Sequence, residues 1–380
     1  MVAILLLYAA IYLKDWASQW VSGTAAIVVL AMGLMTGAWT LMMRGSKARP
    51  IANSCWLIMA IFSVTWLLTF VAKGVVNMSS YYIAIPCAFL IVNLNPRRFI
   101  QILLAHLLIT LLIAAFEYFS GQYFFIYQAA DGTELDEALF GGGLDVFRAK
   151  GMFQGPLSAV AFALWMAFLM RASVPAGAVL FLCAFFSSGR LGMLTATVLV
   201  GFRSLQGGAH TLYGKLPWLL GLVALASLLF AFSDQNRLIF IASAIDTGND
   251  QNVSRSYFWV TSLAYYLSYG PLDLIFGNYG FILEQEGGTE NDFLRLLLDC
   301  GLVGFCLYAG AIVSLITRAL QRRDLEDLLS ALLIIGLMNI FPFVQSLSSA
   351  LLFWIYFFAT VNRPTTGVKG GVKLKVADHF

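Results

Sequence analysis

Long apolar runs, separated by polar segments, recur along almost the whole chain. Each run is continuous rather than alternating between apolar and polar positions, which favours helices over strands. A helix needs roughly 20 residues to cross a bilayer, and shorter or tilted cases occur. The pattern therefore predicts an all-α, polytopic membrane protein with about twelve transmembrane helices, or eleven if the first run does not cross. The runs cover residues 2–13, 21–43, 51–72, 79–94, 99–119, 156–170, 174–188, 191–202, 216–233, 293–317, 328–341 and 345–361.

The composition agrees with a membrane location. Of 380 residues, 60% are hydrophobic and 11% are charged, against roughly 25% charged residues in soluble domains. This balance excludes a soluble enzyme and a disordered protein. The net charge of +3 is too small to indicate a nucleic-acid partner. The five cysteines lie in or beside apolar runs and form no CxxC, so we interpret them as packing residues and predict no metal or other cofactor.

The distribution of basic residues predicts the orientation. Placing about 15 of the basic side chains on the cytoplasmic side satisfies the positive-inside rule, with both termini cytoplasmic. The result is a single transmembrane domain over residues 1–361 and a basic cytoplasmic tail over 362–380. Two long connections, at about 120–155 and 234–292, fall on the outer face, and connections of this length are usually functional.

The second long connection contains a segment with helix signals. We expect a helix from Ser254, as N-cap, to about Tyr269, where Gly270 and Pro271 end it. Its aromatic content is typical of a segment at the membrane interface. The aromatic residues are Tyr257, Phe258, Trp259, Tyr265, Tyr266 and Tyr269.

Arginines on the predicted outer face need an explanation, because the positive-inside rule disfavours them there. Arg190 follows two serines and a glycine at the start of an inward helix, whose free N–H groups and dipole attract anions. Arg255 lies at the other predicted helix start, and two converging arginines would hold a diphosphate. Arg148 and Lys150 would add positive charge. The alternatives are side chains that snorkel to the interface or belong to a solvated loop.

Acidic residues supply the candidate bases. Glu290 lies at the predicted membrane mouth, where partial desolvation would make it a stronger base; alternatively it pairs with the helix dipole. Thr289 and Asp292 are expected to cap the helix that follows. Glu117, near the outer end of its run, is either functional or close enough to reach water. None of the three histidines is predicted on the outer face.

Four segments, in this order, resemble the superfamily of O-antigen ligases and Wzy-type polysaccharide polymerases. The segment 148–156 resembles its Arg-x-x-Gly-x-Phe-x-x-Pro motif. The segment 187–192 resembles its Ser-Arg-Gly helix start, with Gly189 before the arginine as a departure. Arg255 with Trp259, Pro271 and a Gly-x-x-Gly at 277–280 resembles the arginine-containing outer loop, and the segment 290–304 resembles the His-Asn segment, with glutamate replacing histidine.

The resemblance implies a GT-C-type glycosyltransferase that acts on undecaprenyl-diphosphate-linked sugars without a metal or nucleotide. It would work at the periplasmic face of the bacterial inner membrane. By the same resemblance, Arg190 and Arg255 would hold the donor diphosphate. Glu290 would be the base for the acceptor hydroxyl, with inversion at the sugar carbon. The expected substrate-binding residues are Arg148, Lys150, Tyr257, Trp259 and Asn291.

Because ligases carry a histidine where this chain has Glu290, the resemblance favours a polymerase of lipid-linked oligosaccharide repeat units. One alternative is a ligase that transfers the glycan to lipid A-core. Another is a secondary transporter or lipid-linked-sugar flippase, although no repeated half is visible. The expected partners are the lipid-linked glycan donor and acceptor, the bilayer and a chain-length regulator protein, with no nucleic acid.

Overall fold

The computed structural model describes residues 1–13, 23–44, 53–74, 77, 79–125, 147–153, 155–171, 173–205, 250–278, 291–340 and 343–363. These residues form thirteen α-helices and one π-helix. The elements are α1 (Val2–Tyr8), η1 (Ala9–Leu13), α3 (Gly23–Arg44), α4 (Asn53–Lys73), α5 (Ser80–Leu94), α6 (Pro96–Ser120), α8 (Pro156–Leu169), α9 (Val174–Phe186), α10 (Arg190–Leu205), α13 (Asp250–Leu267), α14 (Pro271–Phe276), α15 (Asp292–Arg322), α16 (Leu325–Ile340) and α17 (Leu347–Val361).

The predicted helical class is confirmed for the described residues. Eleven of the twelve apolar runs coincide with helices, and the twelfth, 216–233, lies outside the described residues. Four stretches are long and apolar enough to cross a membrane, as in a multi-pass membrane protein: Ala25–Met43, Cys55–Lys73, Pro96–Ser120 and Asp292–Arg322. Five further apolar helices have 10–17 residues. They are shorter than the roughly 20 residues of a standard span, so length alone does not make them spans.

The chain packs as two compact units, which are described separately. Unit 1 contains Met1–Lys14, Val21–Ile100 and Asp250–Phe380, and unit 2 contains Asp15–Trp20 and Gln101–Asn249. The division falls inside α6, a continuous helix.

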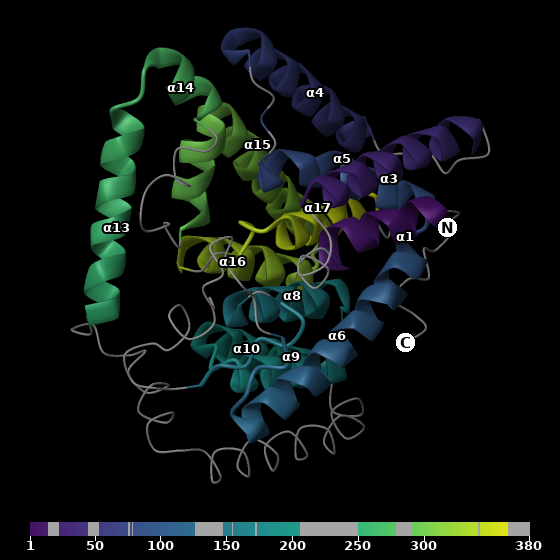
Figure 1. The fold of residues 1–380 in the computed structure, drawn as a ribbon, viewed down its shortest axis with the longest axis vertical. Helices are drawn as coiled ribbons and strands as arrows, with labels where there is room; N and C mark the ends of the chain where they lie inside the picture. The colour runs from purple at the N-terminus through teal and green to yellow at the C-terminus, as the bar shows by residue number, and fades with distance from the viewer. Residues whose placement is uncertain are drawn as a thin grey trace. The chain divides into compact units, whose positions relative to one another are not determined.

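The core of unit 1 is built around α17, which packs against α5 (Figure 1). Aromatic side chains fill it. The Tyr308 ring stacks on Phe353 at 5.1 Å and meets Tyr81 edge-on at 5.7 Å. Trp354 donates a hydrogen bond to the Tyr308 hydroxyl at 2.9 Å, which donates in turn to the Tyr81 carbonyl at 3.0 Å. The chain of donors satisfies polar atoms that would be costly to bury alone.

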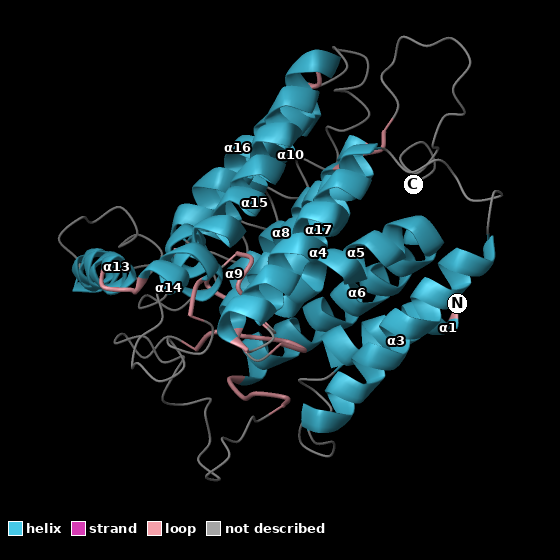
Figure 2. Ribbon diagram, turned by 90° about the horizontal axis from the view of Figure 1, so that it is seen from above, coloured by secondary structure: helices cyan, strands magenta, loops and turns pink. Residues whose placement is uncertain are grey.

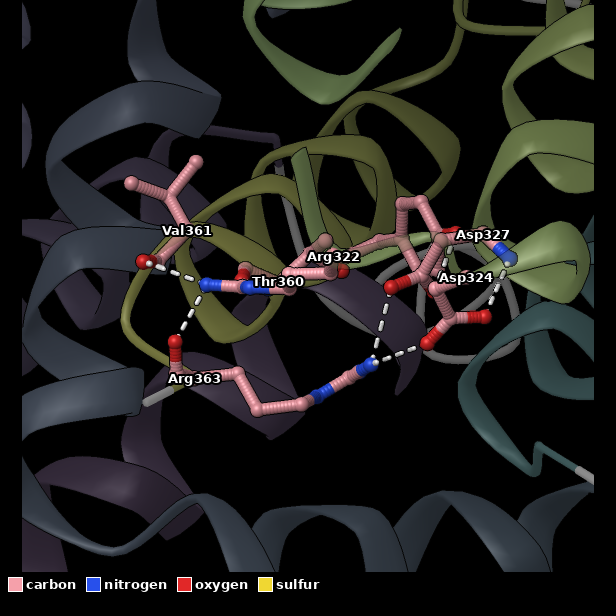
Figure 3. A network of polar contacts seen from close by, with 7 residues as sticks. Arg322, Asp324, Asp327, Thr360, Val361 and Arg363 are labelled. Carbon is pink, nitrogen blue, oxygen red and sulfur yellow. Dashed lines mark hydrogen bonds and ion pairs between the residues drawn. The ribbon is translucent and has the colours of Figure 1, made fainter. Parts of the chain in front are cut away.

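A charged network joins α15, α16 and α17 at one end (Figure 3). Arg322 donates to the Thr360 carbonyl at 2.7 Å and to the Arg363 carbonyl. Arg363 pairs with Asp327 at 2.9 Å and lies 3.8 Å from Asp324. Because the network links the end of α15 to the start of α16 and the end of α17, these helices alternate in direction. The four charged side chains therefore meet at one end of the three helices.

Unit 2 contains α8, α9 and α10, which pack together (Figure 1). Side chains along α8 are almost all buried. Arg203, fully buried near the end of α10, donates to the carbonyls of Ser173 at 3.1 Å and Ala167 at 2.7 Å. These bonds hold the end of α10 against the end of α8 and the start of α9.

Candidate functional site

Glu117 organises a loop in unit 2 that carries two of the predicted basic residues. Its side chain is fully buried in the last turn of α6. One carboxyl oxygen accepts from the backbone N–H groups of Lys150 at 2.8 Å and Gly151 at 2.9 Å, and the other from Phe124 at 3.1 Å. These three hydrogen bonds offset the free-energy cost of removing the carboxyl group from water. Glu117 thus fixes the backbone from which Arg148 and Lys150 project.

The glycine, phenylalanine and proline of the Arg-x-x-Gly-x-Phe-x-x-Pro motif each have a local physical reason. Gly151 has φ +59°, and a Cβ there would lie 2.7 Å from the Thr110 carbonyl oxygen. The ring of Phe153 is buried between His106, 5.4 Å away, and Phe162, 5.1 Å away. Pro156 is the first residue of α8, where its missing N–H costs nothing. The motif therefore encodes a tight turn, a buried anchor and a helix start.

Arg148 connects this loop to the turn before α10. Its Nε donates to the Ser187 carbonyl at 3.2 Å, and the neighbouring N–H of Ala149 donates to the Phe186 carbonyl at 3.2 Å. The Tyr123 hydroxyl donates to the carbonyl of Arg148 at 3.3 Å. Arg148 is half-buried. The first of the predicted segments thus lies directly against the second.

Lys150 is fully buried in the same loop. Its ammonium group lies 4.5 Å from the centroid of the Tyr123 ring, which is within the range of a cation–π interaction. The ring of Tyr123 also packs on Phe147 at 4.6 Å. Lys150 thus lies against an aromatic cluster inside unit 2.

The predicted helix start at Arg190 is confirmed. Ser188 adopts a left-handed conformation, φ +52°, and the N–H of Gly189 donates to the Ala184 carbonyl at 2.6 Å, so the chain turns tightly into α10. The hydroxyls of Ser187 and Ser188 are buried, and neither has a hydrogen-bond partner among the described residues. Arg190, half-buried, is the first residue of the helix.

These residues form the basic cluster of unit 2: Arg148, Lys150, Ser187, Ser188 and Arg190. Arg190 begins α10, and Arg148 donates to the turn just before it, so both basic residues lie at a helix N-terminus. A helix N-terminus carries roughly half a positive charge and unsatisfied N–H groups. Such a combination can bind an anion and stabilise negative charge that develops on a leaving group.

The predicted residues of unit 1 lie in or beside α13 and α15. The expected N-cap at Ser254 is wrong, because the helix begins at Asp250 and Arg255 lies in its second turn. The helix therefore begins four residues before the expected N-cap. Tyr257 is 68% exposed, and Trp259 is half-buried.

Asn291 is the N-cap of α15. Its Oδ1 accepts from the N–H groups of Phe293 at 3.0 Å and Leu294 at 3.1 Å, and its Nδ2 donates to the Asn339 carbonyl at 3.0 Å. The expected capping role of Asp292 is therefore wrong. Its carboxyl group instead accepts from the N–H groups of residues 343 and 344, at 2.8 and 2.9 Å.

Two parts of the predicted site remain predictions. Glu290 lies outside the described residues. Arg190 belongs to unit 2 and Arg255 to unit 1, so their convergence on one diphosphate also remains a prediction. Tyr269 follows α13 in unit 1. Burial raises the pKa of its phenol, and the negative charges of Asp299 and Asp273 raise it further, so the phenol stays protonated at neutral pH.

Sequence reasoning missed the role of Glu117 as the carboxyl group that holds the 148–151 loop. The available signal was an acid inside an apolar run, which must find donors if it is buried. Within the described ranges, no three His, Cys, Asp or Glu side chains gather in a way that could hold a metal ion.

Comparison with protein-family models finds no match to this chain, and comparison with curated proteins finds none either. The resemblance therefore depends on the four segments quoted above. The described residues form an all-helical structure with four helices long and apolar enough to cross a membrane, as in a multi-pass membrane protein, and with basic residues at the start of α10.

Proposed function

We propose that this protein polymerises undecaprenyl-diphosphate-linked oligosaccharide repeat units into O-antigen or a related surface polysaccharide. It would do so at the periplasmic face of the bacterial inner membrane, as a GT-C-type enzyme with about twelve spans. The observation that carries the proposal is the basic cluster of unit 2. Arg190 begins α10 and Arg148 is bonded to the turn before it, while Lys150 lies buried in the same loop as Arg148. Two arginines at a helix N-terminus suit a lipid diphosphate.

The proposed reaction breaks the bond between the sugar C1 and the donor diphosphate oxygen. The acceptor hydroxyl of a second lipid-linked repeat unit attacks C1 from the opposite face, which inverts its configuration. Glu290 takes the hydroxyl proton, and the electron pair of the broken bond leaves with the lipid diphosphate. Arg190 and Arg255 stabilise this growing negative charge by bidentate hydrogen bonds. Arg148 and Lys150 add positive potential.

The residues of unit 1 would bind the organic parts of the substrates. Tyr257, exposed on α13, suits stacking on sugar rings or contact with polyprenyl chains, and Trp259 follows on the same helix. Asn291 would set the position of the preceding Glu290 through its capping bonds to α15. A chain-length regulator protein is the expected protein partner.

Purified protein in proteoliposomes, supplied with a defined lipid-linked repeat unit, tests the proposal. We expect a ladder of polymers, and Arg190→Ala should nearly abolish it. Removing one arginine from a buried charged pair costs about 2–5 kcal/mol, which is on the order of 30- to 4,000-fold in rate. Glu290→Gln should have a similar effect if Glu290 is the base. Arg97→Ala is the matched control, since Arg97 is exposed at the start of α6, at the opposite end of that helix from Glu117.

Other outcomes point to the alternatives. A ligase would make no ladder but would transfer preformed glycan to added lipid A-core. A flippase would move the lipid across the bilayer without a new glycosidic bond. In cells, loss of a polymerase leaves single repeat units attached to the surface glycolipid. If a deletion strain also lacks these single units, the polymerase proposal is wrong.

A further inference from the structure

In unit 1, α13 runs across the direction of the neighbouring helices. Figure 2 shows α13 end-on, whereas α15, α16 and α17 are seen lengthwise. The helix is held there through α14. The Tyr266 hydroxyl donates to the Leu274 carbonyl at 2.8 Å, and Lys73, the last residue of α4, pairs with Asp273 and donates to the Gly277 carbonyl. Because α4 is a candidate membrane span, α14 lies at the level where that span ends.

A bend in α15 lies against the end of α14, so a second candidate span can be located relative to α14. Gly301 has φ +64° and interrupts the helix, and a Cβ there would collide with the backbone of Ile275 and Gly277 at the end of α14. The N–H of Asn278 donates to the Leu298 carbonyl at 2.7 Å. After the bend, residues 302–322 continue as a helix of about 30 Å, which matches the hydrocarbon core of a bilayer. The end of this span therefore also lies beside α14.

The exposed surface of α13 has two chemically different sides. One side is apolar and follows the i, i+3, i+4, i+7 spacing of a single helix face: Val260, Leu263, Ala264 and Leu267. Val260 is 69% exposed and Leu267 68%. The adjacent side carries hydroxyl groups: Tyr257, Thr261, Tyr265 and, just after the helix, Ser268.

We propose that α13 and α14 lie in the plane of the membrane, with the apolar side among the acyl chains of one leaflet and the hydroxyl side at headgroup level. Elements that adjoin α13 at the same level also expose apolar side chains. Leu272 of α14 is 52% exposed, and Val71, in the last turn of α4 before Lys73, is 72% exposed. A non-spanning helix with one apolar side and tyrosines along its border is typical of the interface.

The position of α13 beside the ends of two candidate spans favours lipid, rather than a protein partner, as the contact of its apolar side. The α4 and α15 spans end at α14, so their surrounding lipid reaches the same level. An apolar side at this level meets acyl chains without any further component. The proposal depends only on the membrane location of unit 1 and not on the proposed catalytic function.

Fluorescence quenching tests the proposal in the full-length protein. The exposed Cys306 is first replaced by alanine, and the other described cysteines are buried. Single variants Val260→Cys and Leu267→Cys then carry an environment-sensitive fluorophore, with Thr261→Cys as the matched control on the neighbouring side. The protein is reconstituted into vesicles of phosphatidylethanolamine and phosphatidylglycerol. Quenchers are iodide in the water and nitroxide-labelled acyl chains in the lipid.

We expect fluorophores at 260 and 267 to emit at shorter wavelength, to be quenched by the lipid nitroxide and to be protected from iodide. The fluorophore at 261 should be quenched more by iodide. Iodide quenching at all three positions would mean that α13 stands in water, and the proposal would be wrong. Protection from both quenchers would mean that protein covers this side, which also overturns it. Retention on gel filtration shows that each variant is folded.

Discussion

Replacing Glu117 with glutamine tests how the basic cluster of unit 2 is held. The substitution keeps the shape of the side chain and removes its charge. The carboxyl group accepts from three backbone N–H groups, those of Lys150, Gly151 and Phe124. An amide has one acceptor oxygen, so it can keep the bonds to Lys150 and Gly151 only by turning its own N–H₂ toward Phe124.

The magnitude follows from these bonds. Two of them change from a charged to a neutral acceptor, which weakens each by about 1 kcal/mol, since hydrogen bonds contribute about 1.5–3 kcal/mol with a charged partner and about 1 kcal/mol without. At the third bond, the amide N–H₂ of the glutamine would face the N–H of Phe124, so that two donors oppose each other, at a cost of about 1–3 kcal/mol. The loop over residues 148–153 should therefore open more easily by about 3–5 kcal/mol. At a factor of ten per 1.4 kcal/mol, this is on the order of 100-fold or more.

Hydrogen exchange measured by mass spectrometry is the assay. Peptides covering residues 148–153 should exchange on the order of 100-fold faster in Glu117→Gln than in the unchanged protein, while peptides of unit 1 keep their rates. The matched control is Glu326→Gln, which makes the same chemical change at a buried acid in unit 1. It should leave the 148–153 peptides unchanged.

An unchanged exchange rate at 148–153 in a folded Glu117→Gln protein would refute the reasoning. It would mean that an amide serves as well as the carboxyl group, so charge contributes nothing to holding the loop. Under the proposed function the same variant should also make less polymer, because Arg148 loses its fixed backbone. A full polymer ladder with fast exchange would separate the loop's order from catalysis.

Three further substitutions test other parts of the fold by thermal unfolding in detergent. Gly151→Ala should lose about 2–4 kcal/mol, since alanine disfavours φ +59° and its Cβ would meet the Thr110 carbonyl; an unchanged midpoint would contradict this. Gly301→Ala should reduce the yield of folded protein, because the bend cannot accept a Cβ; normal yield and melting would argue against a tight contact with α14. Asp327→Asn should lose about 1–3 kcal/mol by weakening its half-buried pair with Arg363; equal stability at low salt would show that the pair contributes little.

Helix positions were predictable because hydrophobicity and length are local properties. Helix ends were less so, and α15 shows why. Its apolar run ends near Thr317, but the helix continues to Arg322. Hydrophobicity reports where a chain can contact lipid, whereas a helix ends where the backbone is capped. Here Arg323 adopts a left-handed conformation, φ +53°, and ends the helix.

Local structural features at the candidate site were predictable, but the pairings between its residues were not. A polar helix start with an arginine is a local signal, and Arg190 does begin α10. The bond from Arg148 to Ser187 joins positions 39 apart, and the bond from Gly151 to Glu117 joins positions 34 apart. No periodic pattern encodes such distances. Single-sequence reasoning could name the charges but could not show which carboxyl group holds them.

The charged residues early in α15 show how sequence and structure together explain a position that neither explains alone. From sequence alone, Asp292, Arg295 and Asp299 stand at the start of a long apolar helix, where unpaired charges would be expensive in lipid. The bend at Gly301 separates residues 292–300 from the roughly 30 Å span that follows. Arg295 and Asp299 then pair with each other at 2.8 Å.

These residues therefore need not lie among acyl chains, because the first part of α15 packs with the end of α14, at the end of the span. Asn291, at the start of α15, belongs to this part, and Arg255 lies on α13. With α13 at the interface as proposed, the substrate-binding residues proposed in unit 1 would stand on elements that meet both lipid and water. A diphosphate with a polyprenyl tail requires such a boundary, since its charged and apolar parts must be bound together. The quenching experiment on α13 therefore also tests whether unit 1 can offer this boundary.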